Sequence, residues 1–427
     1  MKLKTLLTWK RAAIGATALW FLLQVVLIVV FWDVAQRSDQ GLYIKMATEC
    51  FEKGVWYPDV DSIYTSYIWA PGLINFFILQ LKLFGTLKAN FFLNLLMNVG
   101  ILWNVWYLSN RFFSRRTAYI AVTLFCLMYS NVMVVLPAGT EVPFLFLSIS
   151  SLSLSLSLSL SPAKPRLHWI ALAGVLLAFA NWVRPLIIIF VPVILLYFWR
   201  NKSHWSCYAA LLAPIVLLSI GFGLLAQRQM GYFVYQSTTS GINLIMTAND
   251  KAYGGVASSL CNDSTSTCYI KDVERYTFAE RDSIRKTRAI EWIKSHPGRF
   301  ATLYVMKLAG LYVEDSWPER PIIGGDGFVD KAAHGGADKA SIVKRIWNMF
   351  YKSVVYYAVL LMFVIAVIKR RKDIMTDKGY LLLLLLLGTL STCIFSVSPR
   401  YHYPFFFAAI IWAAYWLDLK TAKLEKV

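Results

Sequence analysis

The sequence is poor in charge and lacks the signatures of the commonest soluble enzymes. Charged residues make up 16% of its 427 residues, whereas soluble domains carry roughly a quarter. It contains only 24 Asp and Glu and 5 His. It has no Walker loop, no dinucleotide-binding glycine fingerprint, no His-Glu-x-x-His and no Gly-x-Ser-x-Gly. The sequence therefore argues against a soluble domain, and against the nucleotide, zinc-peptidase and serine-hydrolase chemistries of those motifs.

What the sequence has in excess is apolar surface and positive charge. Hydrophobic residues make up 58% of the chain, and the mean hydropathy is +0.53. The net charge is +19, from 43 Lys and Arg against 24 Asp and Glu. The basic residues lie mostly between apolar runs, as in cytoplasmic membrane loops that face anionic lipid. We therefore predict an integral membrane protein whose partner is the lipid bilayer and not nucleic acid.

Ten apolar runs have the length expected of membrane spans. They cover residues 12–32, 90–110, 117–136, 142–161, 168–183, 185–199, 205–226, 351–368, 379–395 and 403–417. Two further runs, 71–84 and 300–313, either span or lie at the interface. With ten spans every basic cluster between spans faces the cytoplasm, whereas twelve would move three clusters outside. The sequence predicts an all-α polytopic bundle of about ten transmembrane helices, or up to twelve, with both termini cytoplasmic.

This topology divides the chain into three parts and places the polar segments on the outer face. The parts are an N-terminal transmembrane module over 1–226, a large outer segment over 227–350 and the last spans over 351–427. The module includes a first outer loop at 33–88. Outside also lie 137–141, 398–402 and a turn at Arg184. Because the inside holds only short basic loops, we expect the chemistry on the outer face.

The first outer loop is both acidic and aromatic. Asp39 begins a predicted interfacial helix, and Tyr43 lies one turn later on the same face. A partly desolvated carboxylate there suits general-base catalysis; the alternative is that Ser38 or Asp39 caps the helix. Tyr67 and Trp69 precede a second interfacial helix. They either contact substrate or belong to an aromatic belt at headgroup level.

Three charged residues stand alone between long apolar stretches. Glu141 is the first residue of a predicted span, where the helix dipole favours a negative charge, but an isolated acid at the membrane boundary is also a functional candidate. Arg184 and Arg400 fall on the outer face, against the usual charge bias. A guanidinium there either binds a substrate phosphate or contacts lipid headgroups by snorkelling. His402 is a weaker candidate for substrate binding. The alternative is that it is an ordinary surface histidine.

The large outer segment contributes weaker signals. Asn243 belongs to a polar stretch, 241–250, whose side chains suit hydroxyl-rich ligands. Cys261 and Cys268 bracket a polar octapeptide, and their location outside the cytoplasm predicts a disulfide. No histidine or further cysteine lies near them in the sequence, which argues against a metal site there.

The ordered set of these motifs resembles the polytopic GT-C glycosyltransferases, and within them glycosyltransferase family 39. The matching pieces are Ser38-Asp39-x3-Tyr43 with Gly54, Ala70-Pro71-Gly72, Phe84-Gly85, Thr140-Glu141, Arg184-Pro185, Asn243 with Gly254, and Arg400-Tyr401. The resemblance implies that Asp39 acts on the acceptor, that Glu141 is a second acid, and that Arg184, Arg400 and Tyr401 lie near the donor phosphate. Gln40 replaces the second of two adjacent acids common in the family, and Ala70-Pro71 replaces Pro-Pro. Family 39 members are generally not metal-dependent, so we expect neither metal nor cofactor.

These observations predict an inverting glycosyltransferase that uses a polyprenyl-phosphate sugar and a glycan, lipid or protein acceptor. The expected setting is the outer face of a bacterial inner membrane. An oligosaccharide ligase or polymerase is the nearest alternative. A lipid-linked sugar transporter would show mid-span charges and internal repeats, which this sequence lacks. The hypothesis requires that Asp39, near the front of the chain, and Arg400, near its end, share one cavity.

Overall fold

A computed structural model describes residues 2–158, 166–256, 258–323 and 339–424. Every regular element in these ranges is a helix. Helices lie over the ten predicted spans: α1 (Lys2–Val30), α4 (Ala89–Phe112), α5 (Arg115–Leu127), α7 (Glu141–Leu158), α8 (Leu167–Val183), α9 (Ile187–Arg200), α10 (Trp205–Met230), α17 (Val354–Lys369), α18 (Gly379–Thr392) and α19 (Tyr403–Leu424). The all-α fold class is therefore confirmed.

The number of membrane crossings stays a prediction. Among the described residues, four helices are long and apolar enough to cross a bilayer: α1, α4, α10 and the helix over Pro399–Ala422, which includes most of α19. A fifth crossing arises if the pair 346–352 and 354–369, bent by 64°, is one span. The other apolar helices have 10–17 residues. Together the long apolar helices show that the chain is an integral membrane protein. The shorter helices do not decide whether it crosses the membrane ten times.

One predicted span is broken in the structure. The run 117–136 is interrupted at Met128, whose ψ of 134° ends α5 and begins the short α6 (Tyr129–Met133). Polar contacts hold the break: Asn131 donates its side-chain amide to the Phe125 carbonyl (2.9 Å), and Trp20 donates to the Asn131 carbonyl (2.9 Å). The apolar run, predicted as a span, did not reveal this break, because hydrophobicity alone does not show backbone groups that distant side chains satisfy.

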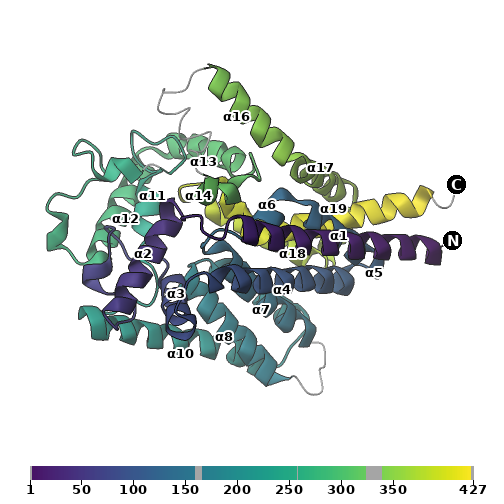
Figure 1. The fold of residues 1–427 in the computed structure, drawn as a ribbon, viewed down its shortest axis with the longest axis horizontal. Coiled ribbons are helices and arrows are strands. Elements are labelled where there is room, and N and C mark those ends of the chain that lie inside the picture. Colours follow the sequence, from purple (N-terminus) through teal and green to yellow (C-terminus); the bar gives the residue numbers. More distant parts are fainter. Residues whose placement is uncertain (1, 159–165, 257, 324–338, 425–427) are drawn as a thin grey trace.

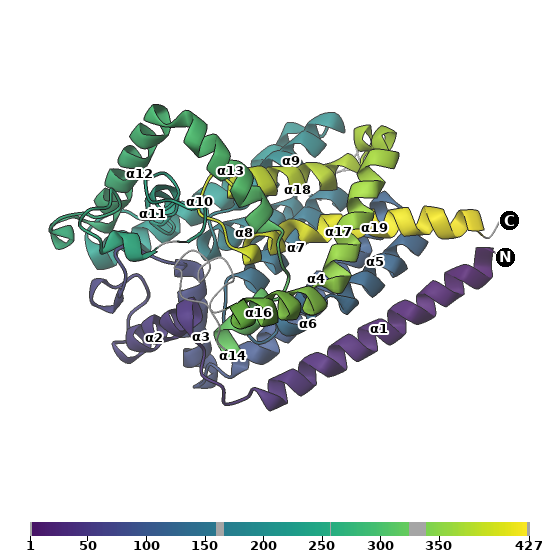
Figure 2. The same cartoon turned by 90° about the horizontal axis from the view of Figure 1, so that it is seen from above.

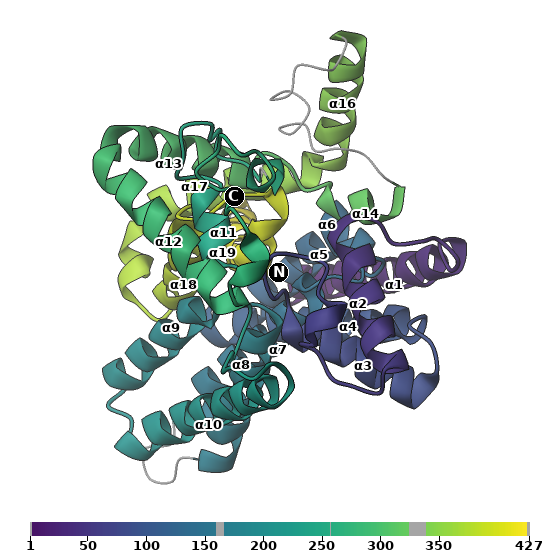
Figure 3. The ribbon, with the colours of Figure 1, turned by 90° about the vertical axis from the view of Figure 1, so that its left-hand side faces the viewer.

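The helices run side by side along the long axis of the molecule (Figures 1 and 2). The two marked termini lie at one end, and α2 (Ser38–Glu52), α11 (Ser240–Ile245) and α12 (Phe278–Ser295) lie at the other. Helix α19 is the centre of the bundle, since its side chains from Tyr403 to Ala414 are buried on every face. Its N-terminal end points toward the end of the molecule that carries α2, α11 and α12, which faces the viewer in Figure 3.

Helix α3 (Pro71–Phe84) positions the first outer loop against the bundle. It begins with Pro71, where the missing N–H costs nothing, and ends at Gly85 with φ +68°. A Cβ on Gly72 would lie 2.6 Å from backbone atoms of Trp182 and Val183. The glycine therefore allows α3 to approach the end of α8, next to Arg184. The two runs predicted either to span or to lie at the interface, 71–84 and 300–313, correspond to the helices α3 and α13 (Pro297–Leu311). Their position in the membrane and the three-part domain division stay predictions.

The outer segment has its own apolar core. It is formed by residues of α11, α12 and α13 and of the chain between α11 and α12. Tyr67 of the first outer loop and Phe395, which follows α18, pack against it. A capping box between Thr277 and Glu280 starts α12. This second core joins the outer segment to the first loop and to the chain that precedes α19.

Lys307 of α13 is a buried cation beside this core. It is 1% exposed and donates to the Ile394 carbonyl (3.3 Å) and Thr247 Oγ1 (3.5 Å). No carboxylate of the described residues lies within 4.0 Å. Burial lowers the pKa of Lys307 from its ordinary 10.5 to about 8. Both partners lie two residues beyond the ends of helices, α18 and α11, so the ammonium satisfies one backbone carbonyl after α18 and one hydroxyl after α11.

We expect Lys307→Met to raise the melting temperature at pH 7 by about 2–4 °C. The unfolded chain holds the proton up to pH 10.5, whereas the folded chain releases it near pH 8. Unfolding therefore takes up a proton between these values, and the stability of the wild type rises with pH there. Melting in detergent at pH 7 and pH 10 checks this. If wild type and variant differ in melting temperature by the same amount at pH 7 and pH 10, this expectation is contradicted.

Candidate active site

Asp39 is the second residue of α2 and bonds to the chain's far end. Helix α2 has Arg37 as its N-cap, and no side chain caps it. Arg400 Nη2 donates to Asp39 Oδ2, and Ser38 Oγ donates to Oδ1 (3.3 Å). The alternative that Asp39 serves as the helix cap does not hold, and the predicted meeting of Asp39 and Arg400 is confirmed.

Glu141 is a second acid near the same arginine. It begins α7 and is 3% exposed. Its Oε1 is 3.4 Å from Arg184 Nη1 and 3.8 Å from Arg400 Nε. The helix dipole and the two cations both stabilise the carboxylate, so the two interpretations of this residue are compatible.

Arg184 and Arg400 share one aromatic partner. Arg184 ends α8, at the break before α9, and Arg400 belongs to η6 (Pro399–His402), directly before α19. Their guanidinium carbons lie 4.7 and 5.5 Å from the centre of the Tyr401 ring. Both arginine side chains are largely enclosed, with 14% and 22% exposed. They pair with acids and do not extend toward a lipid surface as snorkelling would require.

A glutamine holds the loops that carry the two acids together. Gln36 Nε2 donates to the Leu136 carbonyl (3.1 Å), and its Oε1 accepts from the Ala138 N–H (3.2 Å). Gln40 is 1% exposed and lies against Gly139. Neither glutamine was predicted to have a structural role. Gln36 lies just before α2 and Gln40 in its first turn, and their polarity there was the available signal, but polarity does not reveal a partner 100 residues away.

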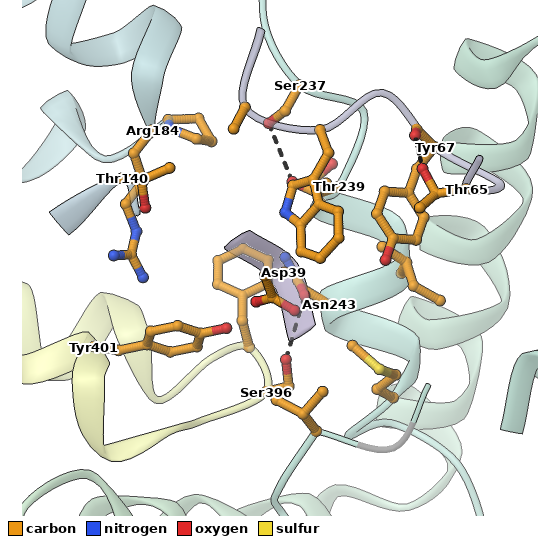
Figure 4. Close-up of a pocket in the computed structure, with 18 of the residues that line it drawn as sticks. Asp39, Thr65, Tyr67, Thr140, Arg184, Ser237, Thr239, Asn243, Ser396 and Tyr401 are labelled. Carbon is orange, nitrogen blue, oxygen red and sulfur yellow. Dashed lines mark hydrogen bonds between the residues drawn. The ribbon is translucent and has the colours of Figure 1, made fainter. Parts of the chain in front are cut away.

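These four charged residues line a cavity of about 680 Å³. In Figure 4, Arg184 and Tyr401 lie on one side, Thr65 and Tyr67 on the other, and Asp39 and Asn243 between them. Trp69 contacts Tyr43 and Tyr67 edge to face, with ring centres 4.9 and 5.5 Å apart.

Tyr43 lies behind the charged groups and is 4% exposed. Burial raises the pKa of its phenol well above the ordinary value, and the nearby Asp39 carboxylate adds to this rise. The group therefore stays protonated at neutral pH and can act only as a neutral hydroxyl. Burial likewise raises the pKa of Tyr67, which lies in the cavity wall.

Two distant segments form the opposite wall of the cavity. Thr238 N–H donates to the Ile68 carbonyl (3.0 Å), and Ile68 N–H donates to Thr238 Oγ1 (2.8 Å). Ser396 N–H donates to the Asn243 carbonyl (2.9 Å), which ties the outer segment to the chain before Arg400. Asn243 was expected here. The Ser-Thr-Thr-Ser run at 237–240, which lies beside it, was not recognised although its hydroxyls were a visible signal.

The structure corrects the interpretation of His402 as a surface residue. His402 is fully buried; its Nδ1 is 2.8 Å from the Leu311 carbonyl, and its Nε2 is 3.8 Å from Asp315 Oδ1. It stacks on Tyr312 at 5.6 Å, behind η6. His402 thus faces the protein interior although Arg400, two residues before it, lines the cavity, because η6 turns successive side chains in different directions.

Cys261 and Cys268 both pack in the outer core as free thiols. Burial raises the pKa of Cys261 to about 11, and Cys268 is one of the groups that add to this. Their pairing as a disulfide stays a prediction. Within the described ranges, no three His, Cys, Asp or Glu side chains are grouped as a metal site would require. Arg400 supplies a positive charge next to both Asp39 and Glu141. The expectation that the protein needs no metal stays a prediction.

The sequence matches no family model and no curated protein. Its fold is similar to that of the Archaeoglobus fulgidus oligosaccharyltransferase. The TM-score is 0.52 to the apo form and 0.53 to the complex with Zn and sulfate, each at 12% identity. These matches cover 96% of this chain and 51% and 49% of the other, so the chain spans about half that length. ArnT from Cupriavidus metallidurans bound to undecaprenyl phosphate matches at a TM-score of 0.40 and 12% identity, over 96% of this chain and 77% of that one. At this identity the likeness to the oligosaccharyltransferase shows a shared fold alone; membership of the GT-C superfamily and of family 39 stays a prediction.

Proposed function

We propose that this protein is a membrane glycosyltransferase that moves a sugar from a polyprenyl-phosphate donor to an acceptor hydroxyl. The observation that carries the proposal is the cluster of Asp39, Glu141, Arg184 and Arg400 in one cavity at one end of the bundle. The fold likeness to an oligosaccharyltransferase supports a transfer function, but a fold alone does not decide function.

The cluster contains the groups that sugar transfer needs. Arg184 and Arg400 bind the donor phosphate, since guanidinium pairs with phosphate oxygens through two parallel hydrogen bonds. Asp39 accepts the acceptor hydroxyl proton as the oxygen attacks the anomeric carbon. The bond from that carbon to the phosphate oxygen breaks, and the phosphate leaves with the electron pair. Attack from the face opposite the phosphate inverts the anomeric centre, and Glu141 holds both arginines in place.

The proposed setting is a bacterial inner membrane, with the site on the outer face and both termini in the cytoplasm. The two termini lie together at the end of the molecule opposite α2, α11 and α12 (Figures 1 and 2). This arrangement supports the proposal, because it separates the site from the termini by the length of the bundle. A polyprenyl chain in the outer leaflet then presents its phosphate at the level of the cavity.

Transfer of a preassembled lipid-linked oligosaccharide is a second candidate. The observation in its favour is the fold likeness to an oligosaccharyltransferase. The cavity of about 680 Å³ lies within the roughly 300–1,000 Å³ of ordinary small-molecule sites. This size accommodates a sugar phosphate with a small acceptor, so we favour transfer of a short unit.

A transfer assay with the purified protein tests the proposal. The protein is reconstituted in vesicles with polyprenyl-phosphate sugars that carry a labelled sugar, and release of polyprenyl phosphate is followed. We expect Glu141→Gln to lower the rate by about 10- to 100-fold, the worth of one charge-assisted hydrogen bond. The matched control is Glu52→Gln, an exposed acid at the end of α2. Equal rates for Glu141→Gln and wild type contradict the role of Glu141, and no turnover of any such donor overturns the function.

A further inference from the structure

Charge is distributed unevenly over the cavity. Among the described residues that line it, the charged ones are two acids and two arginines, all in the Asp39–Arg400 cluster. Their formal charges cancel. The rest of the lining is neutral, and Figure 4 shows Thr65 and Tyr67 of this part across the cavity from Arg184 and Tyr401. The cavity therefore has a charged side and a neutral side.

The neutral side is rich in groups that both donate and accept hydrogen bonds. The uncharged polar groups of the lining, which we call the neutral side, include Thr65, Ser66, Gln236, Ser237, Thr239, Ser240, Asn243, Ser259, Asn262 and Ser396. Figure 4 shows Thr65 beside Tyr67, across the cavity from Arg184, and Asn243 near Asp39. Hydroxyl and amide side chains of this kind match the hydroxyls of a sugar, each of which is donor and acceptor at once. Tyr64, Tyr67 and Trp69 add aromatic faces, on which the C–H face of a sugar ring can pack.

This wall is fixed before any ligand binds. Trp69 N–H donates to Tyr57 Oη (3.1 Å), and Tyr43 and Tyr67 hold its ring from two sides. Arg285 of α12, 2% exposed, donates through Nη2 to Ser66 Oγ (2.8 Å) and through Nη1 to the Ser66 carbonyl (3.4 Å). A rigid wall lowers the entropic cost of binding, which is how weakly binding neutral sugars gain affinity.

We propose that the neutral side is a subsite for an uncharged carbohydrate, so that the acceptor hydroxyl presented to Asp39 is a sugar hydroxyl. The inference rests on the proposed function and narrows its acceptor. The donor sugar is joined to the phosphate, so it lies beside Arg184 and Arg400 and leaves the far side to the acceptor. An anionic acceptor would compete with the donor phosphate for these two arginines. Arg285, a buried cation behind the lining residue Ser66, already has both terminal nitrogens bonded to Ser66.

The acceptor class is tested with three probes in the vesicle assay. These are neutral methyl glycosides and short neutral oligosaccharides, Ser/Thr-containing peptides, and phosphorylated sugars. We expect polyprenyl phosphate release to rise only with neutral saccharides. Release that depends on peptides or phosphorylated sugars and not on neutral saccharides overturns the inference and leaves the proposed function standing. No release with any probe overturns both.

Two side chains allow a test that spares the fold. Ser259 and Asn262 line the neutral side, and among the described residues neither side chain forms a hydrogen bond that holds the wall together. We expect Ser259→Ala and Asn262→Ala each to raise the KM for a neutral saccharide by about 2- to 10-fold, the worth of one hydrogen bond, with the donor KM unchanged. The control is Asn110→Ala on α4, an exposed residue outside the cavity lining. A raised donor KM with an unchanged acceptor KM would place the donor sugar here and overturn the inference.

Discussion

Replacing Arg400 with methionine is expected to lower the transfer rate by about 10²–10³-fold, the usual cost of losing one group that stabilises transition-state charge. The same change should destabilise the outer end of the bundle by about 1–3 kcal/mol, because it leaves Asp39 without its cation. Both side chains are about one-fifth exposed, so this cost lies below that of a fully buried pair.

The measurement combines the transfer rate in vesicles with melting in detergent. Arg400→Lys separates charge from geometry: it restores the positive charge, so most stability should return, but it cannot form the paired hydrogen bonds of a guanidinium. We therefore expect its rate to stay at least tenfold below wild type. Arg371→Met, an exposed arginine of η5 (Arg371–Met375), is the control. Wild-type transfer by Arg400→Met would remove this arginine from the mechanism.

The charged side of the cavity could be predicted from the sequence for a physical reason. In an apolar chain an isolated charge is costly and needs a partner or a function. Asp39, Glu141, Arg184 and Arg400 all stand near long apolar runs, and the topology placed them on one face. The structure joins them by ion pairs. The apolar runs likewise marked the helices, because backbone groups in lipid must be satisfied within a helix.

The neutral side could not be predicted in the same way. Its residues are serines, threonines, asparagines and tyrosines, which are common in any outer loop and carry no cost that demands a partner. Their meeting depends on contacts such as Thr238 with Ile68, 170 residues apart. The break at Met128 and the burial of His402 also depend on distant partners, Trp20 and Asp315 among them. Local patterns report the cost of placing a residue in lipid, and long-range contacts do not appear in them.

Asp39→Asn is expected to reduce transfer by about 10²–10⁴-fold, the contribution of a general base. Asparagine has nearly the same shape but cannot accept the acceptor proton. Wild-type turnover in this variant, with normal expression, would rule out the role of Asp39. Asp61→Asn, an exposed acid of the same outer loop, is the control.

The same variant should bind polyprenyl phosphate more tightly than wild type, by about tenfold. In the structure Arg400 donates to Asp39, so an arriving phosphate must compete with this carboxylate for the guanidinium. Asparagine removes the competitor and leaves the cluster with one net positive charge. The affinity is measured with polyprenyl phosphate in detergent, by thermophoresis of labelled protein, and equal or weaker binding contradicts the competition.

A double-mutant cycle separates competition for Arg400 from a general effect of charge. If Asp39 acts through Arg400, the gain from Asp39→Asn disappears in an Arg400→Gln background; if it acts only by repelling the phosphate, the gain persists. The first outcome has a mechanistic consequence. A base held by the cation that the donor needs becomes free only when the phosphate arrives. Asp39 would then be available to an acceptor, or to water, only in the presence of the sugar that is to be transferred.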